Sequence, residues 1–180
     1  MIAEAAWQEF SLRKVLFIPS GDTPNKDMHH IDKNIRYAMV EKAIEGNGHF
    51  MISPIERDRQ GPSYTVDTIR ILQREFGDDY EFYFICGTDA VADLPTWKYN
   101  RELLSACHFI CASRPGNENE IQKSIDYFGE LGREKIHFLK TPELAISSTI
   151  LRDWIAEKRS VRYLIPDAVI DMIRSNKLYE

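Results

Sequence analysis

Five short, unbroken apolar runs constrain the fold of this chain more than any other feature. They cover residues 14–18, 50–53, 81–86, 108–112 and 136–139, and amphipathic stretches separate them. A continuous apolar run indicates a strand buried on both faces, whereas a strand with one solvent-facing side alternates apolar and polar residues. Buried strands joined by helices are typical of a parallel sheet that is covered on both sides. The pattern therefore predicts an α/β fold with a doubly wound parallel sheet.

The spacing of apolar residues between these runs predicts helices. Helices are expected over residues 2–10, 32–45, 63–76, 118–131, 148–158 and 166–175, with short helical turns over 90–94 and 100–105. Ile35, Met39 and Ala43, for example, recur at the interval of one helical turn. Because no linker, repeat or low-complexity stretch interrupts the pattern, residues 1–180 are predicted to form one domain.

Composition and charge exclude several classes of protein. The formal net charge is −5, which disfavours nucleic-acid binding because nucleic-acid binders usually carry a basic excess. No apolar run approaches the roughly 18 residues needed to span a bilayer. Residues 1–10 lack the basic start and apolar core of a signal peptide. We expect a cytoplasmic protein without nucleic-acid or membrane partners.

The cysteines are odd in number, which favours reduced thiols over a disulfide framework. Cys86 and Cys111 lie inside apolar runs and are predicted to be small core residues, and Cys107 lies next to one. No Cys or His cluster has the spacing of zinc ligands, and His29-His30 is interpreted as a surface pair in a polar loop. No metal site is therefore expected among the side chains.

Polar segments follow four of the predicted strands. They begin at Ile18, Gly87, Ser113 and Ala145. In doubly wound sheets, ligands bind beyond the carboxyl ends of the strands. These four segments are therefore the first candidates for a binding site.

The segment over residues 146–152, ISSTILR, is the sharpest of these candidates. Ser147 or Ser148 can cap the helix that follows, and the free N–H groups at its start suit a phosphate. Arg152, one turn into the helix, adds a cation with fork geometry. The alternative is an ordinary helix cap with a surface arginine.

The segment after the apolar run 81–86 offers a nucleotide site. Gly87 allows close approach of a ligand to the backbone, and Asp89 can accept hydrogen bonds from ribose hydroxyls, unless it only caps the next helical turn. Trp97 lies in a loop broken by Pro95 and can stack on a flat ring. The alternative for Trp97 is a small hydrophobic cluster under the loop.

Residues 61–68, GPSYTVDT, place two hydroxyls and a tyrosine at the start of a predicted helix. The local interpretation is that Ser63 or Thr65 caps that helix. Lys26 lies in a polar loop, where a lysine is usually solvated.

Taken together and in this order, the segments resemble those of the bacterial nicotinate-mononucleotide adenylyltransferase family. The shared segments are IPSG at 18–21, GPSYTVDT at 61–68, GTD at 87–89, LPTWK at 94–98, SRPG at 113–116, ISST with a following Arg at 146–152, RYLIP at 162–166, and Leu178-Tyr179. The resemblance covers essentially the whole chain. GPSYTVDT and ISST-x-x-R are its most specific parts.

The resemblance implies an activity and a fold. The family, part of the nucleotidyltransferase superfamily with a Rossmann-like sheet, joins nicotinate mononucleotide to ATP in NAD biosynthesis. The products are deamido-NAD and pyrophosphate, and the reaction uses Mg²⁺. No enzyme nucleophile is needed, since catalysis is positioning plus neutralisation of charge on the transferring group.

The resemblance also implies roles for residues that match the motifs. Trp97 would stack on the nicotinate ring, and Thr65 would bind its carboxylate with backbone N–H groups near Lys98 and Tyr99. Asp89 would bind a ribose, with Gly87 and Thr88 lining the nucleotide. The ATP phosphates would be held by Ser147, Ser148, Thr149, Arg152 and Lys26, and Arg114 would mark a loop near the substrate.

The chain departs from the family pattern in two places. Where the family reads Pro-Pro-His-Lys, this chain reads Thr23-Pro24-Asn25-Lys26, which keeps the Lys and not the His. The family also begins with an apolar strand and a Gly-Gly-Thr-Phe-Asp-Pro-x-His-x-Gly-His loop, whose histidines bind the phosphates. No segment here matches that loop, and residues 1–6 resemble the helix after it. We therefore expect a chain shortened at its N-terminus, a sheet lacking its first strand with unpaired edges on two neighbours, and no catalytic residue to assign.

Two alternatives remain open at this point. One is a catalytically inactive module that binds nucleotides, and the other is a related adenylyltransferase that acts on nicotinamide mononucleotide or a pantetheine phosphate. Trp97 with Thr65 favours a flat ring that carries a carboxylate. A homo-oligomer is compatible with each of these possibilities.

Overall fold

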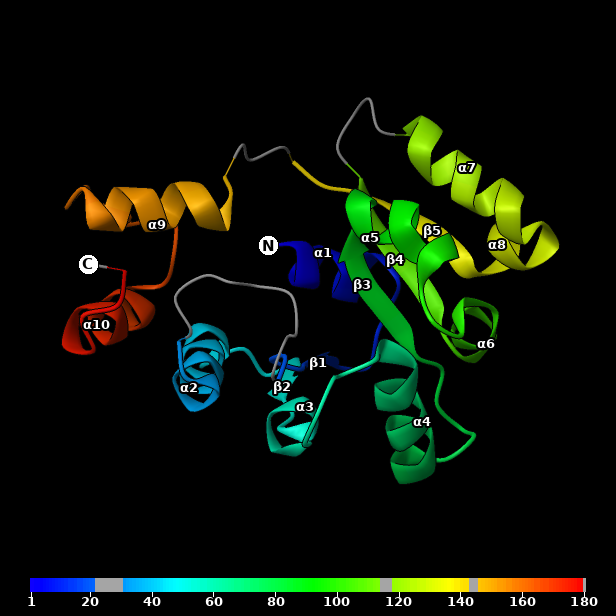
Figure 1. Ribbon diagram of the computed structural model, residues 1–180, viewed down its shortest axis with the longest axis horizontal. Helices are drawn as coiled ribbons and strands as arrows, with labels where there is room; N and C mark the ends of the chain where they lie inside the picture. Colours follow the sequence, from blue (N-terminus) through cyan, green and yellow to red (C-terminus); the bar gives the residue numbers. More distant parts are fainter. Residues whose placement is uncertain (22–30, 114–117, 143–145, 180) are drawn as a thin grey trace. The chain divides into compact units, whose positions relative to one another are not determined.

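The computed structural model describes residues 1–21, 31–113, 118–142 and 146–179. The chain divides into two compact units, each with its own parallel sheet (Figure 1). The first unit contains Met1–Arg13 and Tyr64–Glu143, and the second contains Lys14–Ser63 and Leu144–Glu180. The prediction of one domain over residues 1–180 stays a prediction.

The first unit is built on a three-stranded parallel sheet in the order β3-β4-β5. Its elements are α1 (Ile2–Glu9), α4 (Thr65–Phe76), β3 (Tyr83–Gly87), α5 (Thr88–Asp93), the 3-10 helix η1 (Leu94–Thr96), α6 (Asn100–Ala106), β4 (His108–Ser113), α7 (Glu118–Phe128), α8 (Glu130–Lys135) and β5 (Ile136–Lys140). The register pairs Phe84 with Phe109 and Phe109 with Ile136.

Both faces of this sheet are covered, as the unbroken apolar runs require. On one face, Ala6 of α1 packs against Ile110 and Leu139 in a buried cluster. Phe109 points to the opposite face, because side chains alternate along a strand. The ring of Phe109 is fully buried and contacts Trp97.

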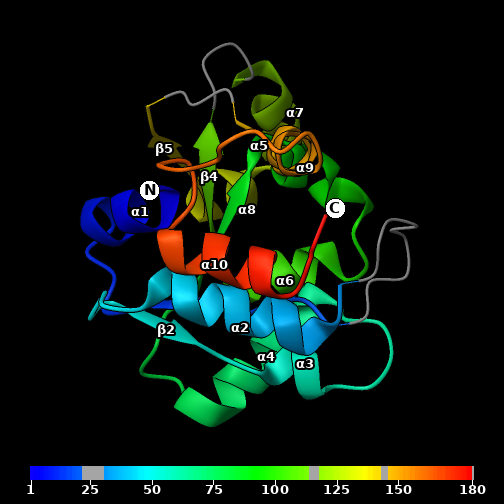
Figure 2. The ribbon, with the colours of Figure 1, turned by 90° about the vertical axis from the view of Figure 1, so that its left-hand side faces the viewer.

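The second unit holds a two-stranded parallel sheet. Its elements are β1 (Val15–Phe17), α2 (Lys33–Ile44), β2 (Phe50–Ile52), α3 (Ile55–Asp58), α9 (Ser148–Ala156) and α10 (Asp167–Ser175). β1 pairs with β2 in the register Val15 to Phe50, and α10 lies alongside α2 (Figure 2). Among the described strands, β1 pairs only with β2 and β3 only with β4, so each has one edge without a strand partner.

The prediction of an α/β fold with parallel strands is confirmed, and each predicted apolar run contains a strand. Two local predictions differ from the structure. The helix expected over 118–131 ends at Phe128 and a second helix starts at Glu130, because Gly129 adopts a φ of 65° that interrupts the helix. The polar stretch after Ile55, for which no element was expected, contains the one-turn helix α3.

A row of rings lies on the α1 face of the first sheet. His108 stacks on Tyr83 with ring centroids 4.8 Å apart and on His137 with centroids 5.1 Å apart. Lys135 Nζ lies 3.0 Å from His108 Nε2, and His108 Nδ1 lies 2.8 Å from His137 Nε2. Lysine can only donate, so His108 accepts at Nε2 and donates from Nδ1. Both imidazoles are therefore neutral in this arrangement.

This pair of histidines predicts that the protein loses stability in acid. Burial, and after it the charge of Lys135, lowers the pKa of both His108 and His137. The negative charges of Glu81 and Glu134 raise the pKa of His108 by a smaller amount. The unfolded chain takes up protons below about pH 6.5, the ordinary histidine pKa, before the folded chain does. The contribution of the two histidines to the free energy of unfolding should therefore be complete above that pH and should decrease as the pH drops through it.

Urea unfolding between about pH 7 and about pH 5 measures this fall. A His108→Gln, His137→Gln double variant should show a shallower decline than the parent. The exposed His49 provides the control, since His49→Gln should keep the parental slope. Equal slopes for the double variant and the parent would contradict the prediction.

Close packing of α7 and α8 gives a second stability prediction. Gly132 is buried, and a Cβ there would lie 2.6 Å from the backbone oxygen of Ile125 and 3.1 Å from Phe128 Cβ. We expect Gly132→Ala to lower the free energy of unfolding by about 1–3 kcal/mol, because the backbone must shift. Gly48→Ala, where a Cβ meets nothing within 4 Å, is the control and should be nearly neutral in the same urea titration.

Candidate functional site

Lys98 brings together the two segments that were predicted to bind a nicotinate ring. Its Nζ lies 4.8 Å from the centroid of the Tyr64 ring and 5.2 Å from that of Tyr99. Tyr64 immediately precedes Thr65, the first residue of α4. No role was predicted for Tyr64, although its place in the GPSYT segment was a usable signal. Thr65, Lys98 and Tyr99 are thus near neighbours in the first unit.

The hydroxyl of Thr65 is not used to cap its own helix. Tyr64 is the N-cap residue of α4, and no side chain caps the helix. The interpretation that Ser63 or Thr65 caps it is therefore wrong. The side chain of Thr65 is half-buried at the first position of α4.

Trp97 is half-buried in the loop after η1. Its ring meets Phe84 and Phe109 edge-on, at centroid distances of 6.1 Å and 6.5 Å. The edge contacts support the hydrophobic-cluster interpretation, and they also fix the plane of the indole. A ring held by its edges keeps its faces available for stacking.

The backbone beside Trp97 has spare hydrogen-bond donors. Tyr99 adopts a left-handed conformation, with φ 58° and ψ 35°, as it enters α6. In the described part of the chain, the N–H groups of Lys98 and Tyr99 have no backbone acceptor. Together with the ammonium of Lys98, they form a positive environment that suits a carboxylate.

The turn after β3 divides the three predicted nucleotide residues into two groups. Gly87 and Asp89 are exposed at the start of α5, and Gly87 itself is the N-cap residue, without a side-chain cap. The interpretation that Asp89 caps this turn is therefore wrong, and its carboxylate faces solvent. Thr88, in contrast, is buried. Its side chain supports the core, so only Gly87 and Asp89 present groups to a ligand.

The predicted phosphate segment in the second unit forms the expected helix start. Ser147 is the N-cap residue of α9 and accepts a hydrogen bond from the N–H of Ile150 at 3.2 Å, so the predicted cap is confirmed. Arg152 donates to the hydroxyl of Thr149 at 3.2 Å, which turns its guanidinium toward the helix start. Ser148 is exposed beside them.

Arg36 belongs to the same neighbourhood, and sequence reasoning missed it. Burial raises the pKa of Tyr179, and the positive charges of Arg152 and Arg36 act in the opposite direction. Both arginines therefore lie close enough to Tyr179 to act on its hydroxyl. Arg36 was treated only as part of a helical stretch, because its partners come from other segments of the chain.

The remaining predictions concern Lys26, Arg114 and the cysteines. Lys26 and Arg114 lie outside the described residues. Burial raises the pKa of Cys86 and of Cys107 to about 12 and that of Cys111 to about 11. The thiols are therefore protonated and are not nucleophiles at neutral pH. Cys111 is a core residue as predicted, whereas Cys86 is only half-buried.

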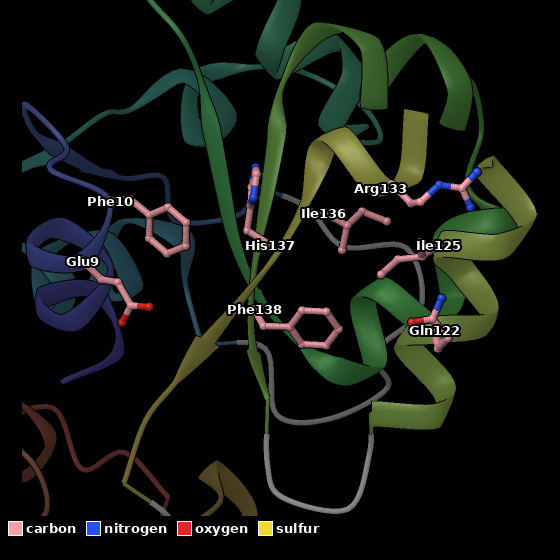
Figure 3. A pocket seen from close by; sticks show the side chains of 8 residues that line it. All are labelled: Glu9, Phe10, Gln122, Ile125, Arg133, Ile136, His137 and Phe138. Carbon is pink, nitrogen blue, oxygen red and sulfur yellow. The ribbon is translucent and has the colours of Figure 1, made fainter. Parts of the chain in front are cut away.

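A hollow in the first unit holds none of the predicted residues (Figure 3). Its volume is about 610 Å³, and it is lined by Glu9, Phe10, Gln122, Ile125, Arg133, Ile136, His137 and Phe138. The lining residues of β5 come from the first part of that strand. Ligands of parallel α/β sheets bind at the opposite, carboxyl ends. We therefore place the candidate site at Gly87 and the Trp97 loop and not in this hollow.

Comparison with known proteins relates this geometry to a family. The cytidylyltransferase-like family model matches residues 1–153. A probable nicotinate-nucleotide adenylyltransferase of Moorella thermoacetica is 44% identical over 179 residues, which cover 98% of this chain and 82% of that protein. The protein of the same name from a Thermoanaerobacter species is 41% identical over 180 residues, covering 99% and 85% of the two chains.

The fold is also similar to a solved structure. The Plasmodium falciparum nicotinic acid mononucleotide adenylyltransferase complexed with NaAD matches with a TM-score of 0.74 at 19% identity, covering 99% of this chain and 90% of that one. No helix in the described parts of this chain is long and apolar enough to cross a membrane. From its full-length similarity to these relatives, the chain belongs to the nicotinate-nucleotide adenylyltransferase family.

Proposed function

We propose that this protein transfers the adenylyl group of ATP to nicotinate mononucleotide in the cytoplasm, a step of NAD biosynthesis that yields deamido-NAD and pyrophosphate. The observation that carries the proposal is that Lys98, the residue after Trp97, lies over the rings of Tyr99 and of Tyr64, the residue before Thr65. A flat ring and a nearby carboxylate are what this group of residues would bind. The names of the relatives agree with that chemistry.

The ring-binding group would distinguish the acid from the amide. Lys98 supplies a positive charge, and the hydroxyl of Thr65 and the N–H groups of Lys98 and Tyr99 supply donors. A carboxylate can accept from each of these groups, and charge-assisted hydrogen bonds are the stronger kind. A carboxamide has no negative charge to offer, so nicotinamide mononucleotide should bind more weakly.

The phosphate segment would neutralise the transferring group. In the reaction, a phosphate oxygen of the mononucleotide attacks the α-phosphorus of ATP in line and pyrophosphate leaves. Arg152, the free N–H groups at the start of α9 and the hydroxyls of Ser147, Ser148 and Thr149 would bind the phosphates of ATP, with Lys26 adding charge. Catalysis of this kind depends on positioning and charge and not on a covalent intermediate.

Mg²⁺ would enter this site together with ATP. Magnesium is commonly held by substrate phosphates, waters and one or two carboxylates, without a dedicated protein cage. The described residues contain no group of three or more His, Cys, Asp or Glu that could hold a metal ion by itself. In this proposal the nucleotide therefore carries the ion into the site.

A pyrophosphate-release assay with ATP, Mg²⁺ and nicotinate mononucleotide tests the proposal. It should be run on the 180-residue chain and on a form extended by the strand and the Gly-Gly-Thr-Phe-Asp-Pro-x-His-x-Gly-His loop of the family. We expect turnover by the extended form, since the two histidines of that loop bind phosphate. An extended form that folds and gives no turnover would contradict the proposal.

A binding module without catalysis is the second candidate, since the segments predicted to hold nucleotides are binding groups and include no assigned catalytic residue. Calorimetric titration of the 180-residue chain with nicotinate mononucleotide examines this candidate. Binding without turnover by either form would support it. Turnover by the extended form would exclude it for the longer protein.

Substitutions in the ring-binding group should act on one substrate only. We expect Trp97→Ala and Thr65→Ala each to raise the KM for nicotinate mononucleotide about tenfold, which corresponds to about 1.4 kcal/mol of lost binding. The KM for ATP should stay near the parental value. Steady-state kinetics of the extended form measure both constants, and an unchanged KM for the mononucleotide would remove the substituted residue from the site.

Arg152→Ala should give the complementary result. The loss of a guanidinium that binds phosphate costs about 1.5–3 kcal/mol for a charged hydrogen bond, so the KM for ATP should rise by about tenfold or more. Arg74, exposed in the last turn of α4, supplies an Arg→Ala control that should be kinetically silent. A parental KM for ATP in Arg152→Ala would contradict the assignment.

A further inference from the structure

Three arginines of the second unit differ in how their charges are satisfied. Arg36 donates to the carbonyl oxygens of Ile31 and Gly21, at 3.3 Å and 2.8 Å, and to Ser20 Oγ at 3.1 Å. These bonds tie α2 to the segment that follows β1. The guanidinium of Arg36 is therefore engaged in holding the unit together.

Arg57 is satisfied by a neighbour in the sequence. Its Nε lies 2.7 Å from a carboxylate oxygen of Asp58, and its guanidinium lies over the ring of Tyr37 at 4.3 Å from the centroid. This arginine has both an ion-pair partner and an aromatic surface. It needs no ligand.

Arg59 has neither kind of partner among the described residues. All three of its guanidinium nitrogens are buried, and none has a hydrogen-bond partner among the residues that the structure describes. The guanidinium stays charged at any pH of interest. A buried guanidinium without hydrogen-bond acceptors is strongly unfavourable, so an anion would satisfy donors that the described residues leave unpaired.

Ser63 is the second group of this kind in the same stretch. Its Oγ is also buried and has no hydrogen-bond partner in the described part of the chain. Arg59 and Ser63 both lie between the end of α3 and the start of α4. Two unsatisfied donors in one short segment indicate a common acceptor.

The location of this segment agrees with a ligand site. Ser63 Oγ lies 3.6 Å from the position that a Cβ would take on Gly21, and Gly21 follows the carboxyl end of β1. The carboxyl ends of parallel strands are where ligands of such sheets bind. Ser63 also precedes Tyr64 and Thr65, the start of the helix assigned to the nicotinate ring.

We propose that Arg59, together with Ser63, forms an oxyanion-binding site that receives an anionic group of the substrate, either a phosphate or the ring carboxylate. The planar guanidinium can donate two parallel hydrogen bonds to either group, and the Ser63 hydroxyl can donate a third. The existence of the anion site rests on the unsatisfied donors alone. Its assignment to nicotinate mononucleotide rests on the proposed function.

The test compares Arg59→Gln with Arg57→Gln in the 180-residue chain. Thermal melts of the ligand-free proteins and calorimetric titrations with pyrophosphate, nicotinate and nicotinate mononucleotide are the measurements. Arg59→Gln should melt at the parental temperature or above it, because an unpaired buried charge has been removed, and should bind the mononucleotide about tenfold or more weakly. Arg57→Gln should keep the parental affinity, and Arg59→Lys, which keeps the charge and loses the fork, should fall between.

The separate probes identify the anionic group. Selective loss of pyrophosphate binding in Arg59→Gln assigns the site to a phosphate, and selective loss of nicotinate binding assigns it to the carboxylate. If pyrophosphate binding falls while neither protein binds the mononucleotide, the anion site stands and the proposed substrate falls. Parental affinity of Arg59→Gln for all three probes overturns the inference, as does a parent protein that binds none of them.

Discussion

Parallel pairing of β3, β4 and β5 is the constraint on which the candidate site depends. Because all three strands run the same way, their carboxyl ends meet at one edge of the sheet, and the segment that follows β3 lies there with Gly87 and Asp89. The amino ends carry a different kind of chemistry. His108 and His137, at or next to strand starts, bond each other and are part of the packing. One sheet thus separates groups that stabilise the unit from groups that remain available to a ligand.

The distribution of charge supports this separation. The chain as a whole is acidic, with a net charge of −5, yet each unit carries basic residues in its predicted binding segments, Lys98 in the first and Arg152 and Arg59 in the second. Net charge governs solubility and long-range attraction, whereas binding of a small anion depends on the few charges within reach of it. An acidic protein with locally positive sites suits small anionic substrates and disfavours a polyanion such as nucleic acid. The charge-based exclusion made from sequence and the cationic site are therefore consistent.

The sequence was most informative where local chemistry determines structure. Apolar runs located all five strands because burial on both faces favours apolar residues over most of a strand, and Ser147 was recognisable as a cap because capping involves only its own helix. The prediction for Thr65 was wrong on capping since two neighbouring residues offered similar hydroxyls and Tyr64 took the position instead. Arg36 and Arg59 could not be told apart from sequence. Whether the guanidinium nitrogens of an arginine find hydrogen-bond partners depends on segments that only the fold brings close.

The contrast between those two arginines indicates how the unit combines stability with binding. Arg36 gives its hydrogen bonds to the backbone after β1 and so fixes the segment that contains Gly21. Arg59 finds no acceptor for its nitrogens among the described residues, which on the inference above destabilises the ligand-free unit and keeps those donors in place for an anion. Because the desolvation of Arg59 has already occurred on folding, an arriving oxyanion meets a group that need not shed water. The ligand-free unit is therefore less stable than it would be with these donors satisfied. Binding of the anion recovers part of that free energy, which appears as affinity for the ligand.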